Sequence, residues 1–351
     1  MADNISLVVQ SKQQQSAWEI GSLADKVTYE THLMGAAGKL EVSFNGNSLS
    51  TQQVTLSPGD TIYLTTNDAN GNTVVIFWGY IFTIKQNRWK EINVTAYDQL
   101  RYLQAVQSYV FTGMTAGQIL QRMAGDFRLS LGTVEDTGYQ IPTSIYENYT
   151  LFDIITDVLS QTNIQTVGDT GKFYIIYDDA GALCLRSVTE MTVPVLLGDG
   201  SLVTEYAFSE DIDSDTYNKI KLVKPNKKTG HADTYIATDE AGFATWGVLQ
   251  KYETVNENLT DAQMRDQIRK YLTYYDRALK TLTIDALGVV GLRAGSLVFV
   301  SLNDLQDFTT PKVLMVDRVL HTWTQSDHQM NLDVRDLIDS APVNGASVTK
   351  E

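Results

Sequence analysis

The fold is decided by two stretches that share one pattern, Leu56-Ser57-Pro58-Gly59-Asp60-Thr61-Ile62-Tyr63-Leu64 near the N-terminus and Leu292-Arg293-Ala294-Gly295-Ser296-Leu297-Val298-Phe299-Val300 near the C-terminus. Each reads as a turn that ends in glycine, then a small polar residue, then a strand whose apolar residues are two positions apart. A turn-and-strand unit repeated at opposite ends of one chain predicts two similar small β-barrels. Such a protein presents the same surface twice.

A second pair of segments follows the two copies and extends the match. Residues 92–98 read Ile-Asn-Val-Thr-Ala-Tyr-Asp, and residues 330–336 read Met-Asn-Leu-Asp-Val-Arg-Asp. Gly79 precedes the first segment by 13 residues, and Asp317 precedes the second by the same interval (92 − 79 and 330 − 317). The equal interval aligns Gly79 with Asp317 in the predicted repeat.

Length and composition limit the class of protein. The chain has 351 residues, 43% of them hydrophobic, and 27 basic against 42 acidic residues give a net charge of −15. Such an acidic chain is expected to bind neither nucleic acid specifically nor an anionic membrane surface. We find no apolar run long enough to span a membrane and no signal peptide. We therefore expect assembly in a reducing cytoplasm, with the single cysteine, Cys184, buried in a strand.

Residues 1–98 read almost entirely as strands separated by turn signals. The run 74–86 is long for a strand and has Gly79 in its middle, which predicts a bend that lets one strand serve both sides of a small barrel. Asn70-Gly71 predicts a tight hairpin, and Asn45-Gly46 marks another turn. The predicted strands cover residues 5–9, 26–32, 38–44, 60–66, 74–86 and 89–97.

Three helices are predicted from an N-cap threonine with an acid or amide three residues later. They start at Thr115, Thr150 and Thr260, and the apolar stripe of the third extends to Leu279. A short helix over residues 98–104 precedes them. Further strands are predicted at residues 172–177, 183–188, 217–223, 233–237, 283–286, 296–302, 312–323 and 329–334.

The predicted fold class is β-rich α+β, with two similar small β-barrels flanking mixed α/β middle segments. Strands from 217–237 are expected to complete the second barrel. The expected domains are a first barrel over 1–98, an α+β middle domain over 99–200, a mixed segment with strands and a long helix over 201–282, a second barrel over 283–340 and a flexible tail over 341–351.

No catalytic, cofactor-binding or metal-binding residue is assigned, because the motifs for nucleotide binding, serine hydrolysis and zinc proteolysis are missing from the sequence. His321 and His328 flank a predicted turn with Asp317 and Asp327 nearby, an arrangement that would permit a metal site. The favoured interpretation is two surface histidines on a polar hairpin.

The acidic run 210–215 resembles the start of a calcium-binding loop. The pattern fails because Thr216 stands where glycine is needed and Leu222 where glutamate is needed. A solvated acidic loop is the favoured interpretation.

Residues 94–103, which run into 110–116, resemble the hub protein of contractile phage tails. The nearest version is the late-control-D-like baseplate hub of Gram-positive prophages and phage-tail-like bacteriocins. The resemblance continues in the same order through most of the chain, at residues 147–155, 215–220, 246–252, 284–288, 316–319, His321 and 328–330.

This resemblance implies a structural protein without enzymatic activity or cofactor. Hub proteins of this family form homotrimers in which two barrels per chain make a ring of six. The ring joins the hexameric tail tube to the trimeric central spike and meets other baseplate proteins. Two barrels per chain suit this role, because a threefold ring of single barrels cannot present six equivalent edges to a sixfold partner. The expected location is the bacterial host cytoplasm during assembly and then the baseplate of a phage tail or tail-like particle.

A different class of function is an alternative. A carbohydrate-binding module or a small cell-wall hydrolase on a β-rich scaffold would use aromatic residues as a sugar platform and a pair of carboxylates. Trp78, Tyr80, Trp89 and Trp323 would suit such a platform. Aromatic residues on strands are more often core or interface residues, which favours the hub. For the hub we expect apolar and aromatic interfaces, with the acids of 210–215 at a channel or outer rim.

Overall fold

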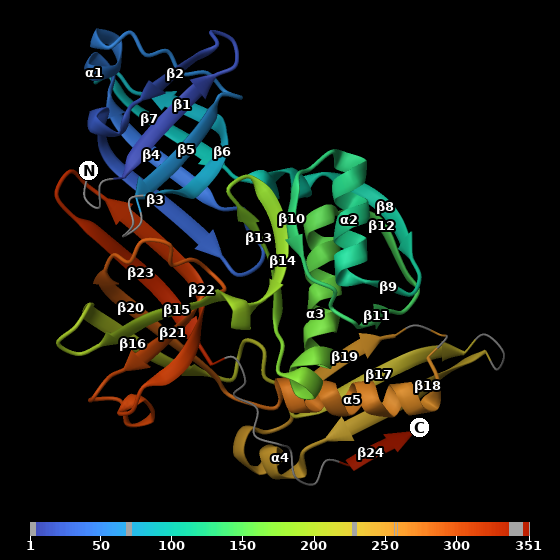
Figure 1. The fold of residues 1–351 in the computed structure, drawn as a ribbon. Helices are drawn as coiled ribbons and strands as arrows, with labels where there is room; N and C mark the ends of the chain where they lie inside the picture. The colour runs from blue at the N-terminus through green and yellow to red at the C-terminus, as the bar shows by residue number, and fades with distance from the viewer. Residues whose placement is uncertain are drawn as a thin grey trace.

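The computed structural model describes residues 5–67, 72–226, 230–255, 257, 259–336 and 347–350. Its main feature is a 13-stranded sheet that runs through both ends of the chain in the order β16-β20-β23-β22-β3-β4-β7-β6-β5-β1-β2, with β21 and β15 attached to β22. Figure 1 shows the N-terminal strands of this sheet curled at the top and its C-terminal strands at the lower left, with most of the helices to the right of them. The β-rich α+β fold class is confirmed. Among the described residues, no helix is long and apolar enough to cross a membrane.

The N-terminal part of the sheet follows the predicted strands closely. The long strand β6 pairs with β5 through its first half and with β7 through its second, and Tyr80 has a partner on each side, Thr61 and Tyr97. This confirms that one strand serves two neighbours around Gly79. A Cβ atom at Gly79 would collide with the carbonyl oxygen of Tyr97. The strands are β1 (Ser6–Ser11), β2 (Ser16–Glu19), β3 (Ala24–His32), β4 (Lys39–Asn45), β5 (Thr61–Asn67), β6 (Thr73–Gln86) and β7 (Glu91–Tyr97).

Two predicted turns in this region have different outcomes. The strands on either side of Asn70-Gly71 form the expected antiparallel hairpin, although these two residues lie outside the described part of the chain. Asn45-Gly46 instead begins the short helix α1 (Gly46–Thr51), because the Asn45 side chain accepts a hydrogen bond from the Asn47 N–H as an N-cap. A 3-10 turn, η2 (Gly21–Leu23), precedes β3.

The C-terminal part of the sheet repeats the N-terminal part strand by strand. The order β3-β4-β7-β6-β5 corresponds to β16-β20-β23-β22-β21. In both copies the glycine of the shared turn donates its N–H to the long strand, Gly59 to Ile81 O and Gly295 to Val316 O, each at 2.8 Å. The strands are β15 (Thr192–Gly198), β16 (Val203–Asp211), β20 (Leu279–Leu287), β21 (Leu297–Ser301), β22 (Lys312–Trp323) and β23 (His328–Arg335), with the 3-10 turn η5 (Gln306–Phe308) after β21.

Irregularities in the strand pairing repeat as well. The register of β6 on β7 shifts between Ile81 and Thr83, and that of β22 on β23 shifts between Val316 and Arg318. A second shift is shared by β3 on β4, between Ala24 and Lys26, and by β16 on β20, between Val203 and Glu205. Equal bulges at equal places identify the two five-stranded units as structural repeats.

The register corrects one sequence alignment. Because Ile81 corresponds to Val316, Asp317 corresponds to the bulge residue Phe82, and Gly79 corresponds to Leu314. The equal interval of 13 residues is therefore a coincidence. It arises because the paired residues Val316 and Val334 of the β22–β23 hairpin are three residues farther apart in the chain than the equivalent pair, Ile81 and Ala96, of the β6–β7 hairpin. The repeat itself is real, but that pair of residues does not match.

The strands at 217–237 were wrongly assigned to the second barrel. They belong to a separate four-stranded sheet in the order β19-β17-β18-β24, of which β17, β18 and β19 lie between β16 and β20 in the chain and β24 lies near the C-terminus. The apolar residues Ile220, Leu222 and Tyr235 pack against helix α5 instead, with Met264 and Ile268. The elements are β17 (Lys219–Asn226), β18 (His231–Thr238), α4 (Glu240–Trp246), β19 (Gln250–Thr254), α5 (Asp261–Tyr275) and β24 (Ser347–Lys350).

The predicted flexible tail is partly wrong. Residues 347–350 form β24, which pairs antiparallel with β18, and Val348 packs against the core of this sheet. Lys350 Nζ lies 2.9 Å from Asp261. Residues 341–346 and 351 lie outside the described part of the chain. The third helix also ends earlier than expected, since Leu279 begins β20.

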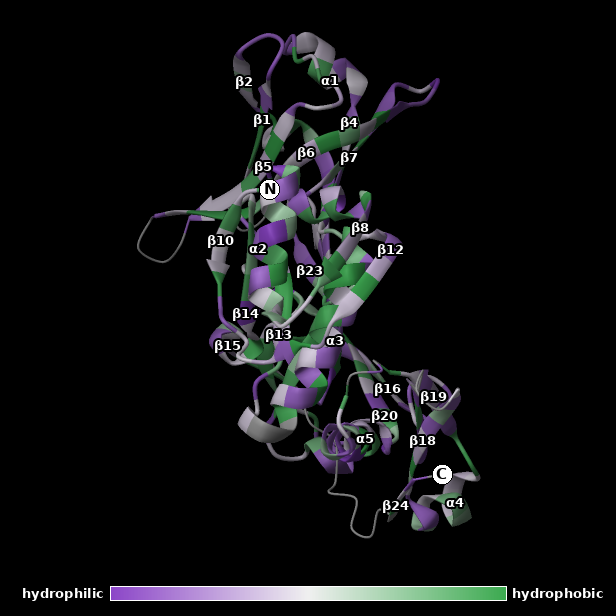
Figure 2. Cartoon of the chain, turned by 90° about the vertical axis from the view of Figure 1, so that its right-hand side faces the viewer, coloured by the Kyte–Doolittle hydropathy of each residue, from purple (hydrophilic) through white to green (hydrophobic). Residues whose placement is uncertain are grey.

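The middle segment packs two antiparallel helices beside small sheets. The N-caps at Thr115, Thr150 and Thr260 are confirmed, and Thr115 and Thr260 form complete capping boxes. The green faces of α2 and α3 in Figure 2 supply its core. The elements are η3 (Gln99–Gln104), β8 (Val106–Phe111), β9 (Met114–Thr115), α2 (Ala116–Phe127), β10 (Leu131–Val134), β11 (Gln140–Ile141), β12 (Ser144–Thr150), α3 (Leu151–Thr170), β13 (Tyr174–Asp179), β14 (Ala182–Ser187) and η4 (Val188–Met191).

Candidate assembly interface

The two repeats are joined by main-chain pairing between β22 and β3. Six residue pairs form this antiparallel junction, from Arg318 opposite His32 to Trp323 opposite Val27. Beyond it, Leu33 N–H donates to Asp317 O at 2.7 Å. The junction turns two units into one continuous sheet, so their relative orientation is set by backbone hydrogen bonds as well as by side-chain packing.

One face of the junction carries a network of polar side chains. Arg318 Nε donates to Glu30 across the junction at 2.7 Å, and Arg318 Nη1 donates to Asn331 on β23 at 2.8 Å. Asn331 in turn donates to Asp285 on β20 at 2.7 Å. Lys39 on β4 lies 3.2 Å from Glu41. Side chains of both repeats therefore form one polar surface over the sheet.

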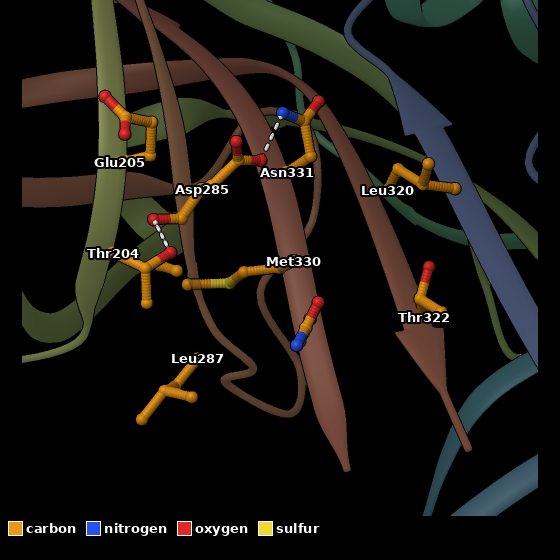
Figure 3. Close-up of a pocket in the computed structure, with 10 residues that line it drawn as sticks. Thr204, Glu205, Asp285, Leu287, Leu320, Thr322, Met330 and Asn331 are labelled. Atoms are coloured by element: carbon orange, nitrogen blue, oxygen red, sulfur yellow. Dashed lines mark hydrogen bonds between the residues drawn. The ribbon is translucent and has the colours of Figure 1, made fainter.

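A hollow of about 440 Å³ lies on the C-terminal part of this polar surface. Figure 3 shows Thr204, Glu205 and Asp285 on one side of it and Leu320 and Thr322 on the other. Thr204 Oγ1 donates to the Asp285 carbonyl oxygen at 3.0 Å. Acids and small polar groups predominate in its lining, and it is open to solvent, so it offers a surface rather than an enclosed catalytic pocket.

The opposite face of the junction is buried and contains the two histidines. His321 and His328 are 2% and 5% exposed, so the predicted surface hairpin is wrong. His321 Nε2 lies 2.7 Å from Leu292 O, and its Nδ1 lies 3.0 Å from His328 Nε2. Trp323 stacks on both imidazole rings. The two histidines therefore fill the core that the repeats share.

The surroundings of His321 keep it neutral. Burial lowers its pKa to about 4, with His328 adding to the effect. Since the carbonyl of Leu292 can only accept a hydrogen bond, Nε2 of His321 carries the proton and Nδ1 accepts from His328. Asp317, one of the two carboxylates in the sequence-based hypothesis, instead accepts a hydrogen bond from Arg335 Nε at 2.8 Å. No set of three metal-ligating side chains is grouped anywhere in the described ranges.

A buried charged cluster ties the repeats to the middle segment. Asp98 accepts the N–H groups of Gly38 at 2.9 Å and Leu100 at 3.0 Å, and Asp178 accepts that of Gly181 at 2.8 Å. Burial raises the pKa of both carboxyl groups, that of Asp178 to about 6. The Arg293 guanidinium, from the C-terminal copy of the repeated turn, opposes this rise.

The four aromatic residues of the sugar-platform hypothesis are not brought together. Trp323 is fully buried in the core of the N-terminal repeat. Trp78 packs against Tyr80 with ring centroids 5.0 Å apart. Trp89 is 70% exposed at the tip of the β6–β7 hairpin, under the Arg88 guanidinium. The positions of these side chains fit core and interface roles.

The acidic run 210–215 lies at the end of a strand and in the bend that follows it. Glu210 and Asp211 form the end of strand β16, and Asp211 accepts the N–H of Asp213 at 2.6 Å. The run therefore has two residues in the strand and four in the bend that follows, and it is not a closed calcium loop. Cys184 is buried in β14, as predicted, and burial raises the pKa of its thiol.

Sequence reasoning did not identify the exposed edges and apolar positions. Among the residues that the structure describes, strand β16 pairs only with β20, and six of its nine residues are exposed. On the two-stranded sheet β8–β12, Val110 and Ile145 lie opposite one another and are 54% and 65% exposed. Figure 2 shows these strands side by side at the surface. Solvent-facing apolar pairs and unpaired edges are features of contact surfaces.

The amino-acid sequence is similar to those of known proteins over most of its length. The sequence model of the family described as YQBQ-like matches residues 27–335. YqbQ of Bacillus subtilis strain 168 is 31% identical over 277 residues, covering 76% of this chain and 81% of its own length. XkdQ of the phage-like element PBSX, from the same strain, is 29% identical over 323 residues, covering 89% and 92%.

A similar fold is found among solved structures. The tail protein from Neisseria meningitidis MC58 superposes with a TM-score of 0.66 over 95% of this chain and 96% of its own, at 13% identity. At this identity the likeness concerns the fold. It covers both repeats and the segments between them.

Proposed function

The chain belongs to the YQBQ-like family, and from that premise we propose that it is the structural baseplate hub of a contractile tail. The hub is a homotrimer that acts as a symmetry adapter between the hexameric tail tube and the trimeric central spike. It also contacts other baseplate proteins and acts without enzymatic activity or cofactor. Its relatives include a protein of a phage-like element, and its fold is that of a tail protein.

The observation that carries the proposal is the equivalence of the two five-stranded units. They share strand order, both bulges and the glycine turn, and they sit in one sheet. Three chains with two equivalent units each offer six similar edges, which is the number a hexameric tube requires. The polar face of the sheet, with Glu30, Asp285 and Asp333, is the surface we assign to the central channel.

The proposal extends to location and to the parts of the chain. The hub assembles in the cytoplasm of the bacterial host and then resides in the baseplate of a phage tail or tail-like particle. We propose that the repeats, within residues 1–98 and within 192–211 joined with 279–336, form the ring. The middle segment and the four-stranded sheet then lie outside it and contact neighbouring proteins.

Mass in solution and particle shape test the proposal. The purified chain is measured by sedimentation velocity and by electron microscopy, with a parallel assay for hydrolysis of cell-wall glycan. The hub predicts a trimer, ring-shaped class averages and no turnover. A monomer that binds or cleaves glycans would contradict it and would favour the carbohydrate-binding or cell-wall hydrolase alternative.

A further inference from the structure

The internal junction leaves two matching edges of the sheet without a strand partner. Inside the chain, the second half of β22 pairs with β3. The structural equivalent of β22 in the first repeat is β6, and the equivalent of β3 in the second repeat is β16. Within the described ranges, residues 83–86 of β6 pair with β7 only, and β16 pairs with β20 only. Each open edge is thus the counterpart of an edge that is joined inside the chain.

We propose that residues 83–86 of β6 pair antiparallel with residues 208–211 of β16 in a second copy of this chain. This inference rests on the proposed trimer and specifies how its subunits are joined. The contact is heterologous, since two different edges meet, and such contacts form a ring when the rotation closes. Junctions within a chain and between chains would then alternate around one continuous sheet.

The repeat also fixes the register of this junction. Arg318 corresponds to Thr83 and His32 to Asp211, because the bulges and core pairs of the two units superimpose. Transferring the β22–β3 register therefore places Thr83 opposite Asp211 of the second copy. The remaining pairs are Ile84 with Glu210, Lys85 with Ser209 and Gln86 with Phe208.

Backbone directions agree with this register. Asn87 N–H donates to Glu91 O at 3.1 Å, so odd-numbered residues in this half of β6 face β7, while Ile84 and Gln86 face the open edge. In β3, the direction of Leu33 N–H toward Asp317 O shows that odd-numbered residues face the junction. Their equivalents in β16 are even-numbered, so Phe208 and Glu210 face the open edge. Free donors and acceptors therefore meet in register.

Charge favours a second copy over other strand-forming partners. The β6 side of the junction carries Lys85, with Arg88 and Lys90 in the adjoining turn, and the β16 side carries Glu210 and Asp211. In this register Lys85 would lie diagonally across from Asp211 of the second copy. Opposite charges on neighbouring strands attract, so this pair would favour the contact. The internal junction carries a comparable pair, Arg318 with Glu30. This differs from the expectation that residues 210–215 face a channel or rim.

Strand β16 is exposed in the single chain, and the proposed junction would cover its open edge in the trimer. A nine-residue edge strand with solvent-facing main-chain groups is a template for pairing with another chain. Phe208 is 37% exposed at this edge. Its equivalent in the first repeat, Tyr29, is 4% exposed and stacks on His321 from across the internal junction. The second copy would supply the corresponding cover through Gln86.

Disulfide trapping tests the register. In the variant Lys85→Cys with Ser209→Cys, the two side chains would lie on one face at a pair without mutual hydrogen bonds, where Cα atoms are about 4.5 Å apart. Mild oxidation should convert most of the protein to a covalent trimer. The control is Lys85→Cys with Glu210→Cys, because Glu210 is adjacent but points to the other face. The buried Cys184 remains in both variants.

The outcomes separate this inference from the proposed function. A trimer that does not crosslink, or that crosslinks better in the control pair, overturns the strand junction and leaves the trimeric hub intact. A chain that stays monomeric at tens of micromolar overturns the trimer and the junction together. Covalent trimers in the test pair alone support both.

A second variant removes the pairing without cysteines. Glu210→Pro deletes an N–H that faces the open edge, and proline is tolerated at such positions of edge strands. The variant should remain folded by circular dichroism, with an unfolding midpoint close to that of the wild type, and sediment as a monomer. A Glu210→Pro variant that trimerises like the wild type would overturn the proposed junction.

Discussion

At the scale of single residues, Gly79 shows how one position allows β6 to pair with two neighbouring strands. It lies where β6 passes from β5 to β7, and a side chain there would meet the carbonyl oxygen of Tyr97 and the ring of Phe77. We expect Gly79→Val to lower the free energy of unfolding by about 1–3 kcal/mol, as overpacking does. Urea denaturation at pH 7.5 measures this loss.

The matched control is Gly125→Ala in α2. No heavy atom lies within 4 Å of the Cβ position there, and the site is helical. This variant should gain about 0.4–1 kcal/mol, because alanine reduces the entropy of the unfolded chain. Equal stabilities for the two variants would contradict the role assigned to Gly79.

His321 makes stability depend on pH. Its pKa is about 4 in the folded protein, because of burial, and about 6.5 in an unfolded chain. The unfolded state therefore binds the extra proton first, so this contribution to stability is complete above about pH 6.5 and is lost as pH falls to about 4. The loss should be roughly 3 kcal/mol. Unfolding by urea at pH 7.5 and at pH 5 measures most of it.

Asp98 and Asp178 act in the opposite direction, so the pH effect must be compared between variants. Burial raises their pKa values, which means that the folded state gains stability as they take up protons at falling pH. His321→Gln keeps a donor for Leu292 O and removes the titrating ring. The fall in stability between pH 7.5 and 5 should be smaller in this variant. An unchanged pH dependence would show that His321 does not titrate as stated.

At the scale of elements, removing β24 would show how much this short strand stabilises the four-stranded sheet. Deleting residues 347–351 removes the pairing with β18, the ion pair of Lys350 with Asp261 and the packing of Val348. We expect β18 amides that face β24 to lose about 1–2 kcal/mol of protection in native-state hydrogen exchange. Deleting residue 351 alone serves as the control. Unaltered protection of β18 in the longer deletion would refute the pairing.

At the scale of the whole molecule, the response of the trimer to salt tests whether charge pairs or other contacts hold it together. Three chains of −15 carry −45 together, and this repulsion weakens as salt screens charge over about 10 Å at 0.1 M. The attraction of Lys85 toward Asp211 weakens as well. Because main-chain hydrogen bonds and buried apolar contacts respond little to salt, the trimer fraction should change little between about 0.05 and 0.3 M NaCl. Sedimentation at both concentrations measures it, and dissociation in salt would show that charge pairs hold the ring.

The sequence alone determined the local elements and the existence of the repeat. Alternating apolar residues fix which strands have one buried face, and threonine caps fix where helices begin, because both depend on neighbouring residues only. The glycine turns at Gly59 and Gly295 identified the two equivalent units. The order of resembling segments identified the family that the comparisons then showed.

The tertiary structure decided which strands pair and what becomes buried. Strands at 217–237 have the same alternation whether they complete a barrel or cover α5, so the sequence could not separate these possibilities. In the sequence His321 and His328 look like polar surface residues, and only the folded sheet buries them. The match of Asp317 with Phe82 depends on a bulge, which is a property of two strands together. Long-range pairing is set by the cooperative fit of distant segments, and for that reason only the folded chain shows the internal junction and the two open edges.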